Sequence, residues 1–244
     1  MWLVGIDEAG RGPVIGPLVI TIFACKEGKV EELRQQGVKD SKLLPSKKRI
    51  ELAKILAEND SFYSETAVIS AHEIDNYVDS TSLNDLEITY FAKLIDNLPE
   101  HIAKNCQIML DACEVNTDNF TQKVLLKLKK FANEQNISAE NKADLNHIHV
   151  ACASILAKEN REREVSEIKE KLGLDIGSGY PSDPKTKSAV QVLTNENLPN
   201  KYLRFSWATT KNAWEINHNS QLKKRELKLW LPKEIILIFK QLVS

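Results

Sequence analysis

The hydrophobic pattern of the chain begins with two strand-like runs on either side of a glycine-rich turn. Residues 2–6 and 18–25 are mainly apolar, which is typical of strands buried in a sheet. Asp7 and Glu8 follow the first run, and glycines at 10, 12 and 16 allow close backbone approach to a ligand or a positive φ. The pattern predicts a strand ending in two acids, a tight loop and a second strand. A surface β-turn explains this stretch equally well.

Strand-like and helical patterns alternate beyond this loop. Ser46 is placed to cap a helix whose apolar stripe contains Ile50, Leu52 and Leu56. The next predicted elements are a strand over 61–69, helices over 71–78 and 83–98, a strand over 107–110 and a helix over 117–133. A hairpin followed by such alternation is typical of a mixed sheet covered by helices.

The second half of the chain is mainly helical. After a loop containing Ile137, Asp144 opens the longest helical pattern, which runs to about Leu172. Its first half is apolar and its second half is charged, so we expect only the first half to pack in the core. A loop rich in Gly and Pro covers 177–184, and further helices are predicted over 186–195 and from 211 onward.

Composition indicates an intracellular globular protein. The 244 residues suffice for one large domain with a smaller appendage, and 42% apolar residues support a core. No run approaches the roughly 20 apolar residues of a membrane helix, and no secretory signal opens the chain. The four cysteines form no C-x-x-C pair, which favours reduced, buried thiols over zinc binding or disulfides. We therefore expect a cytoplasmic protein without membrane contact.

Charge is distributed unevenly along the chain. Residues 201–244 contain nine Lys and Arg against three Asp and Glu, a local net charge of +6. The overall charge is −1, so residues 1–200 carry −7. An acidic body with a basic end suits a metal site beside a phosphate-binding surface, but a solvated lysine-rich helix face explains the basic end as well.

Acidic residues recur at matching positions. Asp7 and Glu8 end the first strand, Asp111 ends a later strand, and Asp144 begins the longest helix. Strand ends of open α/β sheets meet at one rim, where gathered carboxylates repel one another unless a cation neutralises them. Oxygen ligands indicate Mg²⁺ or Mn²⁺, and two such ions about 3.5–4 Å apart hydrolyse phosphodiesters. Each acid taken singly is also explained structurally, for example as an N-cap at Asp144.

Other catalytic chemistries find little support. His147 and His149 lie two residues apart, so a helix would direct them to different faces. No G-x-S-x-G motif is present, and no cysteine stands in a nucleophile motif.

The motifs together resemble those of type 2 ribonuclease H (ribonuclease HII), with a pattern nearest to archaeal members. The matching segments are Gly5–Pro13, Asp40–Lys42, Leu110–Ala112, Lys142–Asp144, Ala153–Lys158, Gly177–Asp183 and Arg204–Trp207. They stand in the family's order over residues 1–210. Leu43, Pro45 and Asn141 depart from the residues that relatives often carry.

The resemblance implies an α/β, ribonuclease H-like fold: a five-stranded mixed sheet flanked by helices, with a helical C-terminal extension. We expect a catalytic domain over 1–183 and a basic helical segment over 184–244 packed on it. The resemblance further implies that the metal-binding catalytic acids, with two Mg²⁺ or Mn²⁺ ions during catalysis, are Asp7, Glu8, Asp111 and Asp144.

The implied reaction is cleavage of the RNA strand of RNA–DNA hybrids, and cleavage 5′ to single ribonucleotides in duplex DNA. The products carry 3′-hydroxyl and 5′-phosphate ends. The resemblance implies that the backbone of Gly10, Arg11 and Gly12 reads the 2′-hydroxyl in the minor groove. It implies that Tyr180 packs on a sugar at the junction, and that Lys42 and Arg11 contact phosphates.

The last residues match no family motif. The run 235–239 either covers the core or docks a partner such as a sliding clamp, and we favour the core because no Gln-led clamp motif is present. We expect a monomer. Two rival hypotheses are a nuclease or resolvase of other specificity on the same fold, and a non-catalytic nucleic-acid-binding protein.

Overall fold

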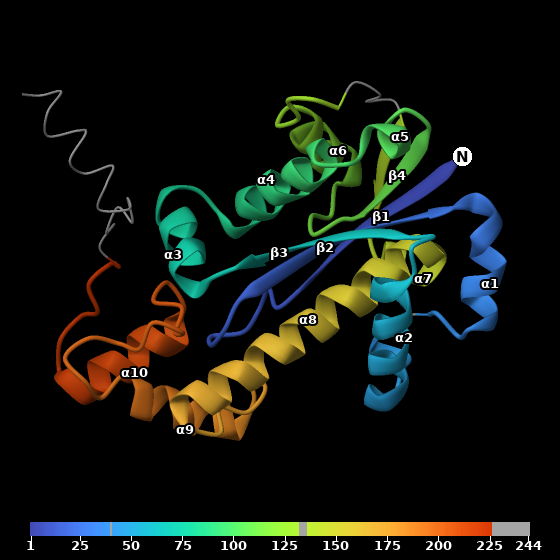
Figure 1. The fold of residues 1–244 in the computed structure, drawn as a ribbon. Helices are drawn as coiled ribbons and strands as arrows, with labels where there is room; N and C mark the ends of the chain where they lie inside the picture. The colour runs from blue at the N-terminus through green and yellow to red at the C-terminus, as the bar shows by residue number, and fades with distance from the viewer. Residues whose placement is uncertain (40, 132–135, 226–244) are drawn as a thin grey trace, which may run out of the picture.

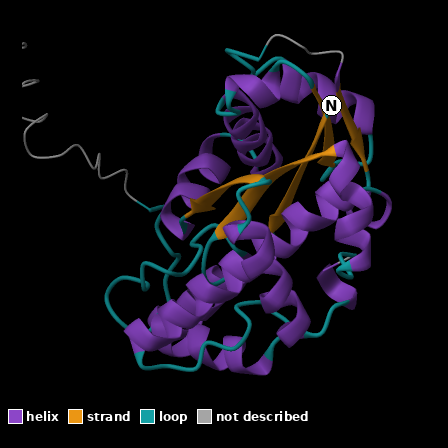
Figure 2. Cartoon of the chain, turned by 45° about the vertical axis from the view of Figure 1, so that its right-hand side comes forward, coloured by secondary structure: helices purple, strands orange, loops and turns teal. Residues whose placement is uncertain are grey.

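A five-stranded mixed sheet forms the centre of the molecule, with helices on both faces (Figures 1 and 2). The computed structural model describes residues 1–39, 41–131 and 136–225, and the side chain of Lys42 is outside this description. The predicted run 235–239 also lies outside the described residues. The α/β class and the five-stranded sheet expected from the sequence are confirmed.

The strand order is β3-β2-β1-β4-β5, so β1 is the central strand. The strands are β1 (Trp2–Ala9), β2 (Leu18–Lys26), β3 (Tyr63–Ile69), β4 (Cys106–Asp111) and β5 (Ile137–Glu140). β1 pairs antiparallel with β2 and parallel with β4. Both faces of β1 are covered by helices, which explains its nearly continuous apolar sequence.

The helices divide between the two faces of the sheet. One face carries α3 (Ala71–Ser80), α4 (Leu83–Asp96), α5 (Glu100–Ala103) and α6 (Thr117–Leu125). The other carries α1 (Val30–Gln35), α2 (Ser46–Glu58) and α8 (Ile148–Leu172), with α7 (Ala143–Asn146) at the N-terminal end of α8. The C-terminal part contains α9 (Pro184–Leu193) and α10 (Ala208–His218).

The second half of α8 does not project into solvent, as its charge had led us to expect. Val165 and Ile168 are each 4% exposed, and they pack with Val14 and Ile15 of the loop after β1. Apolar residues from 176 to 213 complete this cluster, and a β-bridge joins Ile15 to Leu203. Arg161 is buried as well, at 5% exposure, while Glu162, Arg163, Glu170 and Lys171 are exposed. A later part of the chain therefore supplies the burial of the apolar positions.

The predicted boundaries around Asp144 are wrong in two respects. Residues 137–140, expected in a loop, form β5 at the edge of the sheet. Asp144 lies in the short helix α7 and not at the start of the long helix, because His147 is extended (φ −120°, ψ 112°) and separates α7 from α8. The rings of His147 and His149 therefore meet, 5.5 Å apart, where a continuous helix would have separated them.

Two other helices differ from their predicted form. Ile50 is 56% exposed and Ser46 makes no cap, so the buried stripe of α2 is Arg49, Leu52 and Leu56. α6 ends at Leu125, whereas the apolar spacing predicted helix to 133.

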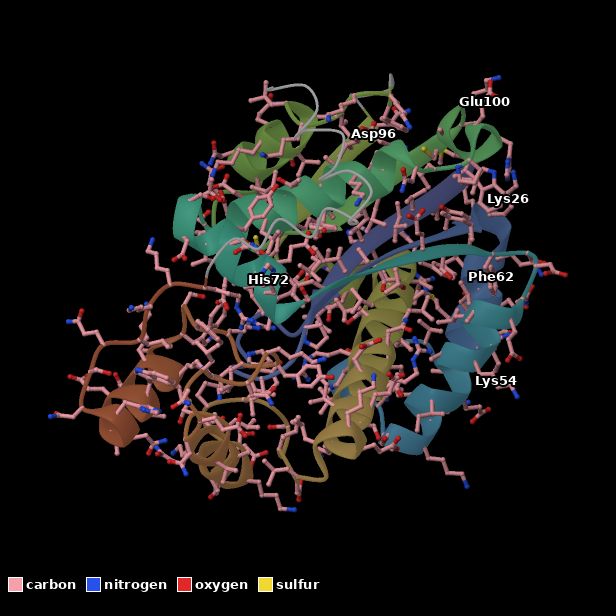
Figure 3. The ribbon with its side chains drawn as sticks, turned by 60° about the vertical axis from the view of Figure 1, so that its left-hand side comes forward. Lys26, Lys54, Phe62, His72, Asp96 and Glu100 are labelled. Carbon is pink, nitrogen blue, oxygen red and sulfur yellow. The ribbon has the colours of Figure 1, made fainter. Side chains whose placement is uncertain are left out.

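The early end of α6 has a local cause at the end of α4. The carboxylate of Asp96, labelled in Figure 3, accepts the backbone N–H groups of Lys129, Lys130 and Phe131 at 2.9–3.0 Å. These bonds satisfy three amides outside a helix, and Phe131 turns into the core at 8% exposure.

All four cysteines are free thiols, and all but Cys113 are buried. No helix in the described ranges has the length and apolar character needed to cross a membrane.

Candidate active site

The pairing of β1 with β4 brings the first acids together. Ile6 lies opposite Leu110 in the parallel register, so Asp7 and Asp111 stand next to each other at the same strand ends. Asp111 Oδ1 accepts the backbone N–H of Ala143 at 2.9 Å, which holds the short helix of Asp144 against β4. The acids predicted from three separate segments thus meet at one rim of the sheet.

Burial makes this group of carboxylates electrostatically unfavourable on its own. Asp7 and Asp144 are each 4% exposed. Burial, and then the charge of Asp111, raises the pKa of Asp7 to about 8. Burial and the charge of Asp7 raise the pKa of Glu8 well above its ordinary range. The backbone N–H of Glu8 donates to Asp7 Oδ1 at 2.7 Å, which offsets only part of the repulsion.

The acids fit a hard divalent cation in donor type and burial. All their donor atoms are carboxylate oxygens, and the buried Oε2 of Glu8 has no hydrogen-bond partner among the described residues. Within the same residues, no three His, Cys, Asp or Glu side chains converge closely enough to hold an ion as they stand. Side-chain rotation would therefore accompany metal binding.

A cavity of about 470 Å³ opens beside the acids. Its lining includes the acids Asp7, Glu8 and Asp111. It also includes Lys158, Arg161 and Tyr180. Lys158 and Arg161 lie on α8, and Tyr180 lies in the loop before α9. Carboxylates and cationic side chains thus face one space, which can accept a metal-bound phosphodiester.

The loop after β1, residues 10–16, is here called the glycine turn. Gly10 has φ +94°, and a Cβ there would lie 2.6 Å from the Arg161 side chain and from the Pro17 carbonyl oxygen. A Cβ on Gly12 would face the ring of Tyr180 at 3.4 Å. Tyr180 is 39% exposed and lies 5.1 Å from the Arg161 guanidinium. The predicted readers Gly10, Gly12 and Tyr180 are therefore neighbours.

Arg204 supports the glycine turn from behind. Its fully buried guanidinium donates to the carbonyl oxygens of Gly10, Arg11 and Gly16 at 2.6, 2.9 and 3.1 Å. Trp207 Nε1 donates to the Gly12 carbonyl at 3.2 Å. The backbone N–H of Arg204 also donates to the Val14 carbonyl at 2.9 Å, so one short segment holds five carbonyls of the turn. The Arg-to-Trp motif is visible in the sequence, but its role is not, because 194 residues separate Arg204 from Gly10.

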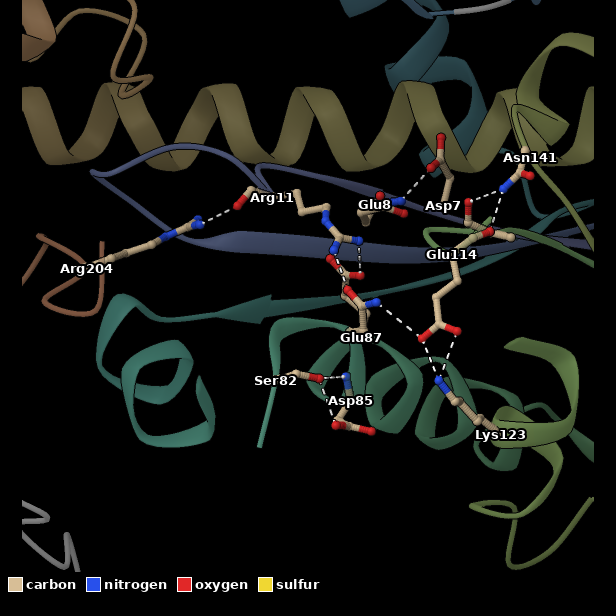
Figure 4. Close-up of polar contacts among 12 residues, drawn as sticks. Asp7, Glu8, Arg11, Ser82, Asp85, Glu87, Glu114, Lys123, Asn141 and Arg204 are labelled. Atoms are coloured by element: carbon tan, nitrogen blue, oxygen red, sulfur yellow. Dashed lines mark hydrogen bonds and ion pairs between the residues drawn. The ribbon is translucent and has the colours of Figure 1, made fainter. Parts of the chain in front are cut away.

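Arg11 is oriented toward α4 by a buried acid (Figure 4). Its Nη1 lies 2.7 Å from Oε2 of Glu87, which is fully buried, and its Nη2 donates to Asn84. Burial raises the pKa of Glu87 to about 6, and the charge of Arg11 opposes that rise. About a third of the Arg11 side chain remains exposed, so its predicted phosphate contact must use that part.

A polar network continues from α4 to the loop after β4 (Figure 4). Asn84 Nδ2 donates to Glu114, and Lys123 Nζ lies 2.8 Å from the same carboxylate. Asn141, which precedes the helix of Asp144, donates to the carbonyls of Ala112 and Glu114 at 3.0 and 2.8 Å. The network ties together the loops beside two of the acids. No local sequence signal identified Glu87 or Glu114.

Comparison with known proteins supplies the family context. The model of the family "Ribonuclease HII" matches residues 4–210. The chain is 40% identical over 231 residues to the ribonuclease HII of Methanocaldococcus jannaschii, covering 91% of this chain and 99% of that one. It is 42% identical over 219 residues to the ribonuclease HII of Thermococcus sibiricus, covering 88% and 92%.

Solved structures show the same arrangement. The crystal structure of ribonuclease H2 from Pyrococcus horikoshii OT3 matches with a TM-score of 0.78 and 35% identity, covering 90% of this chain and all of that one. Ribonuclease HII from Archaeoglobus fulgidus, solved in complex with PCNA, matches with a TM-score of 0.74 and 31% identity, covering 94% and 100%. Bst ribonuclease HIII in complex with Mn²⁺, at 19% identity, shares the fold, with a TM-score of 0.77 over 90% of this chain and 71% of that one.

Proposed function

The chain belongs to the ribonuclease HII family and is a nuclease, and from this premise we propose its substrate and cleavage site. It hydrolyses the RNA strand of RNA–DNA hybrids and cuts 5′ to single ribonucleotides embedded in duplex DNA. The products carry 3′-hydroxyl and 5′-phosphate ends. The observation that supports this most directly is the cavity in which buried acids face the glycine turn, Arg161 and Tyr180.

We infer that Asp7, Glu8, Asp111 and Asp144 hold two divalent ions, Mg²⁺ or Mn²⁺, during catalysis. The raised pKa values of Asp7 and Glu8, and the buried Glu8 oxygen without a hydrogen bond, support a cation at this place. Such ions, when bound, activate a water molecule and stabilise the leaving oxygen of a phosphodiester. The chain's own part is to hold the four carboxylates close together, where a bound cation would favour their ionised forms, and to direct Asp7, Glu8 and Asp111 into the cavity.

The glycine turn is proposed to read the ribose. Only the 2′-hydroxyl distinguishes RNA from DNA, so a group of the protein must reach it directly. Backbone groups at Gly10, Arg11 and Gly12 can approach because two of these residues have no side chain. Arg204 fixes the carbonyls of Gly10 and Arg11, and Trp207 fixes that of Gly12. Tyr180, beside Gly12, is proposed to pack on the sugar at the junction.

Cationic side chains around the cavity are proposed to bind the phosphates. Lys158 lines the cavity together with the acids. Arg11 uses the exposed part of its guanidinium while Glu87 holds the rest. The contact expected from Lys42 stays a prediction, because its side chain lies outside the described residues.

A labelled DNA duplex with one ribonucleotide, incubated with Mg²⁺ beside an all-DNA control, tests the proposal. We expect a single cut on the 5′ side of the ribonucleotide and none in the control. Cleavage of a long RNA–DNA hybrid without that cut would keep the metal site and contradict the reading of single ribonucleotides.

The same experiment separates the rival hypotheses. A resolvase or nuclease of other specificity would cut the all-DNA duplex or a branched DNA. A non-catalytic binding protein would retain the hybrid in EDTA and cleave neither substrate with Mg²⁺ or Mn²⁺. Buried carboxylates that repel phosphate argue against the binding protein.

We further propose a cytoplasmic monomer that contacts a sliding clamp through its last residues, which for the run 235–239 is the alternative to covering the core. The support is the Archaeoglobus fulgidus relative, which was solved in complex with PCNA. Light scattering after gel filtration tests the monomer. Binding of an archaeal PCNA by the full chain, compared with a chain ending at Arg225, tests the contact: equal binding by both would contradict it.

A further inference from the structure

Asp75 on α3 lies outside the cavity but holds the segment that supports the glycine turn. Its carboxyl group is 1% exposed. It accepts the backbone N–H groups of Phe205 and Ser206, each at 2.9 Å, and the Ser206 hydroxyl at 2.6 Å. These donors directly follow Arg204, so Asp75 anchors Arg204 to the helices that cover the sheet.

Arg225 binds the same carboxylate from the other side. Its Nε donates to Asp75 Oδ2 at 3.0 Å, and its Nη2 donates to the Leu203 carbonyl at 2.5 Å. Its guanidinium lies over the Phe205 ring, 3.7 Å from the centroid. Arg225 thus encloses residues 203–206 between itself and Asp75. We call Asp75, residues 203–206 and Arg225 the clasp.

The clasp has a mechanical connection to the turn. The carboxylate fixes the backbone of residues 205 and 206, while the Arg204 side chain reaches three carbonyls of the glycine turn. Arg204 is fully buried, so it has no alternative partner in water if the backbone shifts. Loosening residues 205–206 would therefore loosen the turn, although no clasp side chain lines the cavity.

We propose that Asp75 is a positioning residue for ribose recognition, acting through Arg204, and that Arg225 completes its clasp. This inference rests on the proposed function of the glycine turn. Charge-assisted hydrogen bonds to buried groups are the strong ones, which is why a carboxylate suits this place. The clasp also makes selectivity depend on the segment that follows α10.

Asp75→Asn tests the clasp. Asparagine keeps one acceptor oxygen, places an NH₂ group against donors and removes the charge facing Arg225. Binding to a duplex with one ribonucleotide and to an all-DNA duplex is measured in EDTA, and kcat and KM are measured with Mg²⁺. We expect the binding preference for the ribonucleotide to fall roughly tenfold, the effect of one lost charge-assisted hydrogen bond. KM should rise more than kcat falls.

Asp96→Asn is the matched control. Asp96 also accepts three backbone N–H groups, but those of residues 129–131, away from the cavity. We expect it to lower the melting temperature and leave the preference unchanged. If Asp75→Asn does not fold, Ser206→Ala, which removes one donor, should show a smaller loss of preference in the same direction.

The outcomes separate the clasp from the function on which it rests. A wild-type chain that binds both duplexes equally overturns the proposed function, and the clasp with it. If the wild type prefers the ribonucleotide duplex and Asp75→Asn keeps that preference in full, the clasp alone is overturned. The same holds for Ser206→Ala if it is used in place of Asp75→Asn. If Arg225→Gln keeps the full binding preference for the ribonucleotide duplex, Arg225 does not contribute to the clasp.

Discussion

At the scale of single residues, Asp7 combines the features expected of a metal ligand. It is buried, it lies beside Asp111, and both facts raise its pKa to about 8. A buried acid of this kind destabilises the metal-free fold when it is ionised, because the unfolded chain releases the proton more readily. A cation bound beside it would relieve this repulsion, in line with the metal site proposed above.

Asp7→Asn should abolish turnover while preserving the fold. We expect kcat to fall at least a thousandfold, of the order of the several kcal/mol that a catalytic metal supplies. Without metal, the melting temperature should rise by roughly 2–4 °C, because about 1 kcal/mol of repulsion is removed. Mg²⁺ should raise the melting temperature of wild type more than that of the variant. Exposed Asp60→Asn is the control, and unchanged turnover in Asp7→Asn would contradict the site.

Tyr180→Ala should damage cleavage at a single ribonucleotide more than cleavage of a long hybrid. Loss of aromatic stacking reduces binding by roughly tenfold or more. Tyr180→Phe keeps the ring and serves as the matched control for the hydroxyl. Initial rates on both substrates give the answer, and equal rates for wild type and Tyr180→Ala on the embedded ribonucleotide would contradict the assignment.

His149 should make the fold sensitive to mild acid. Burial, and then the neighbouring His147, lowers the pKa of His149 to about 4. Below about pH 6.5, His149 takes up a proton in the unfolded chain but stays neutral in the folded chain. The folded state therefore loses stability relative to the unfolded state as pH falls from about 6.5 to 4. The free energy of unfolding between pH 7 and 5 should fall by about 2 kcal/mol more in wild type than in His149→Gln. Urea titrations measure this free energy at each pH, and an equal fall in wild type and His149→Gln would contradict the prediction.

At the scale of elements, the packing of α8 on β1 depends on one glycine. A Cβ on Gly5 would lie 2.4 Å from the backbone carbonyl atoms of His149. Helix backbone cannot yield as a side chain does, so Gly5→Ala should destabilise the fold by roughly 3 kcal/mol. Gly28→Ala, where a Cβ meets nothing within 4 Å, should change stability by less than about 0.5 kcal/mol. Urea denaturation distinguishes them, and equal midpoints would contradict the close approach.

Helices and strands could be predicted from the sequence where the spacing of apolar residues and the flanking turn residues indicate the same element. β1, β2, β3, β4 and the loop at 177–184 follow this rule, and so does the position of Asp111 at a strand end. β5 was missed because four residues carry no clear period. The break at His147 was missed because helical spacing continues across it.

The remaining features depend on contacts that local pattern cannot contain. The charged half of α8 is buried by residues from 176 onward, and α6 is ended by Asp96 on another helix. Arg11 pairs with Glu87, 76 residues away. The four acids could be nominated from their positions, but the buried polar groups that hold the glycine turn could not.

At the scale of the whole molecule, the C-terminal helices and the catalytic body share one core. Val14 and Ile15 pack with Val165 and Ile168 and with residues after 176, and Arg204 enters the glycine turn. The described residues after 183 thus share an apolar cluster with the loop after β1 and with α8, and removing them would expose that cluster.

A chain of residues 1–183 should fail to fold cooperatively. Its exposed apolar cluster and unsupported turn should give aggregation or a broad thermal transition, whereas residues 1–225 should melt in one step. Circular dichroism melting curves of both chains provide the comparison. A soluble 1–183 chain with a sharp transition would show that the segment is dispensable for folding.

The distance along the chain between Gly10 and Arg204 has a consequence for biosynthesis. A ribosome releases the first hairpin early, and local strand pairs can form at once. The parallel partner β4 arrives only after a long crossover, and the turn receives Arg204 when the described chain is nearly complete. A polypeptide whose translation stops before Arg204 therefore lacks the residue that holds the glycine turn, the proposed reader of the ribose. Early termination should therefore yield a chain that is degraded by proteases. It should not yield a nuclease that has lost its selectivity.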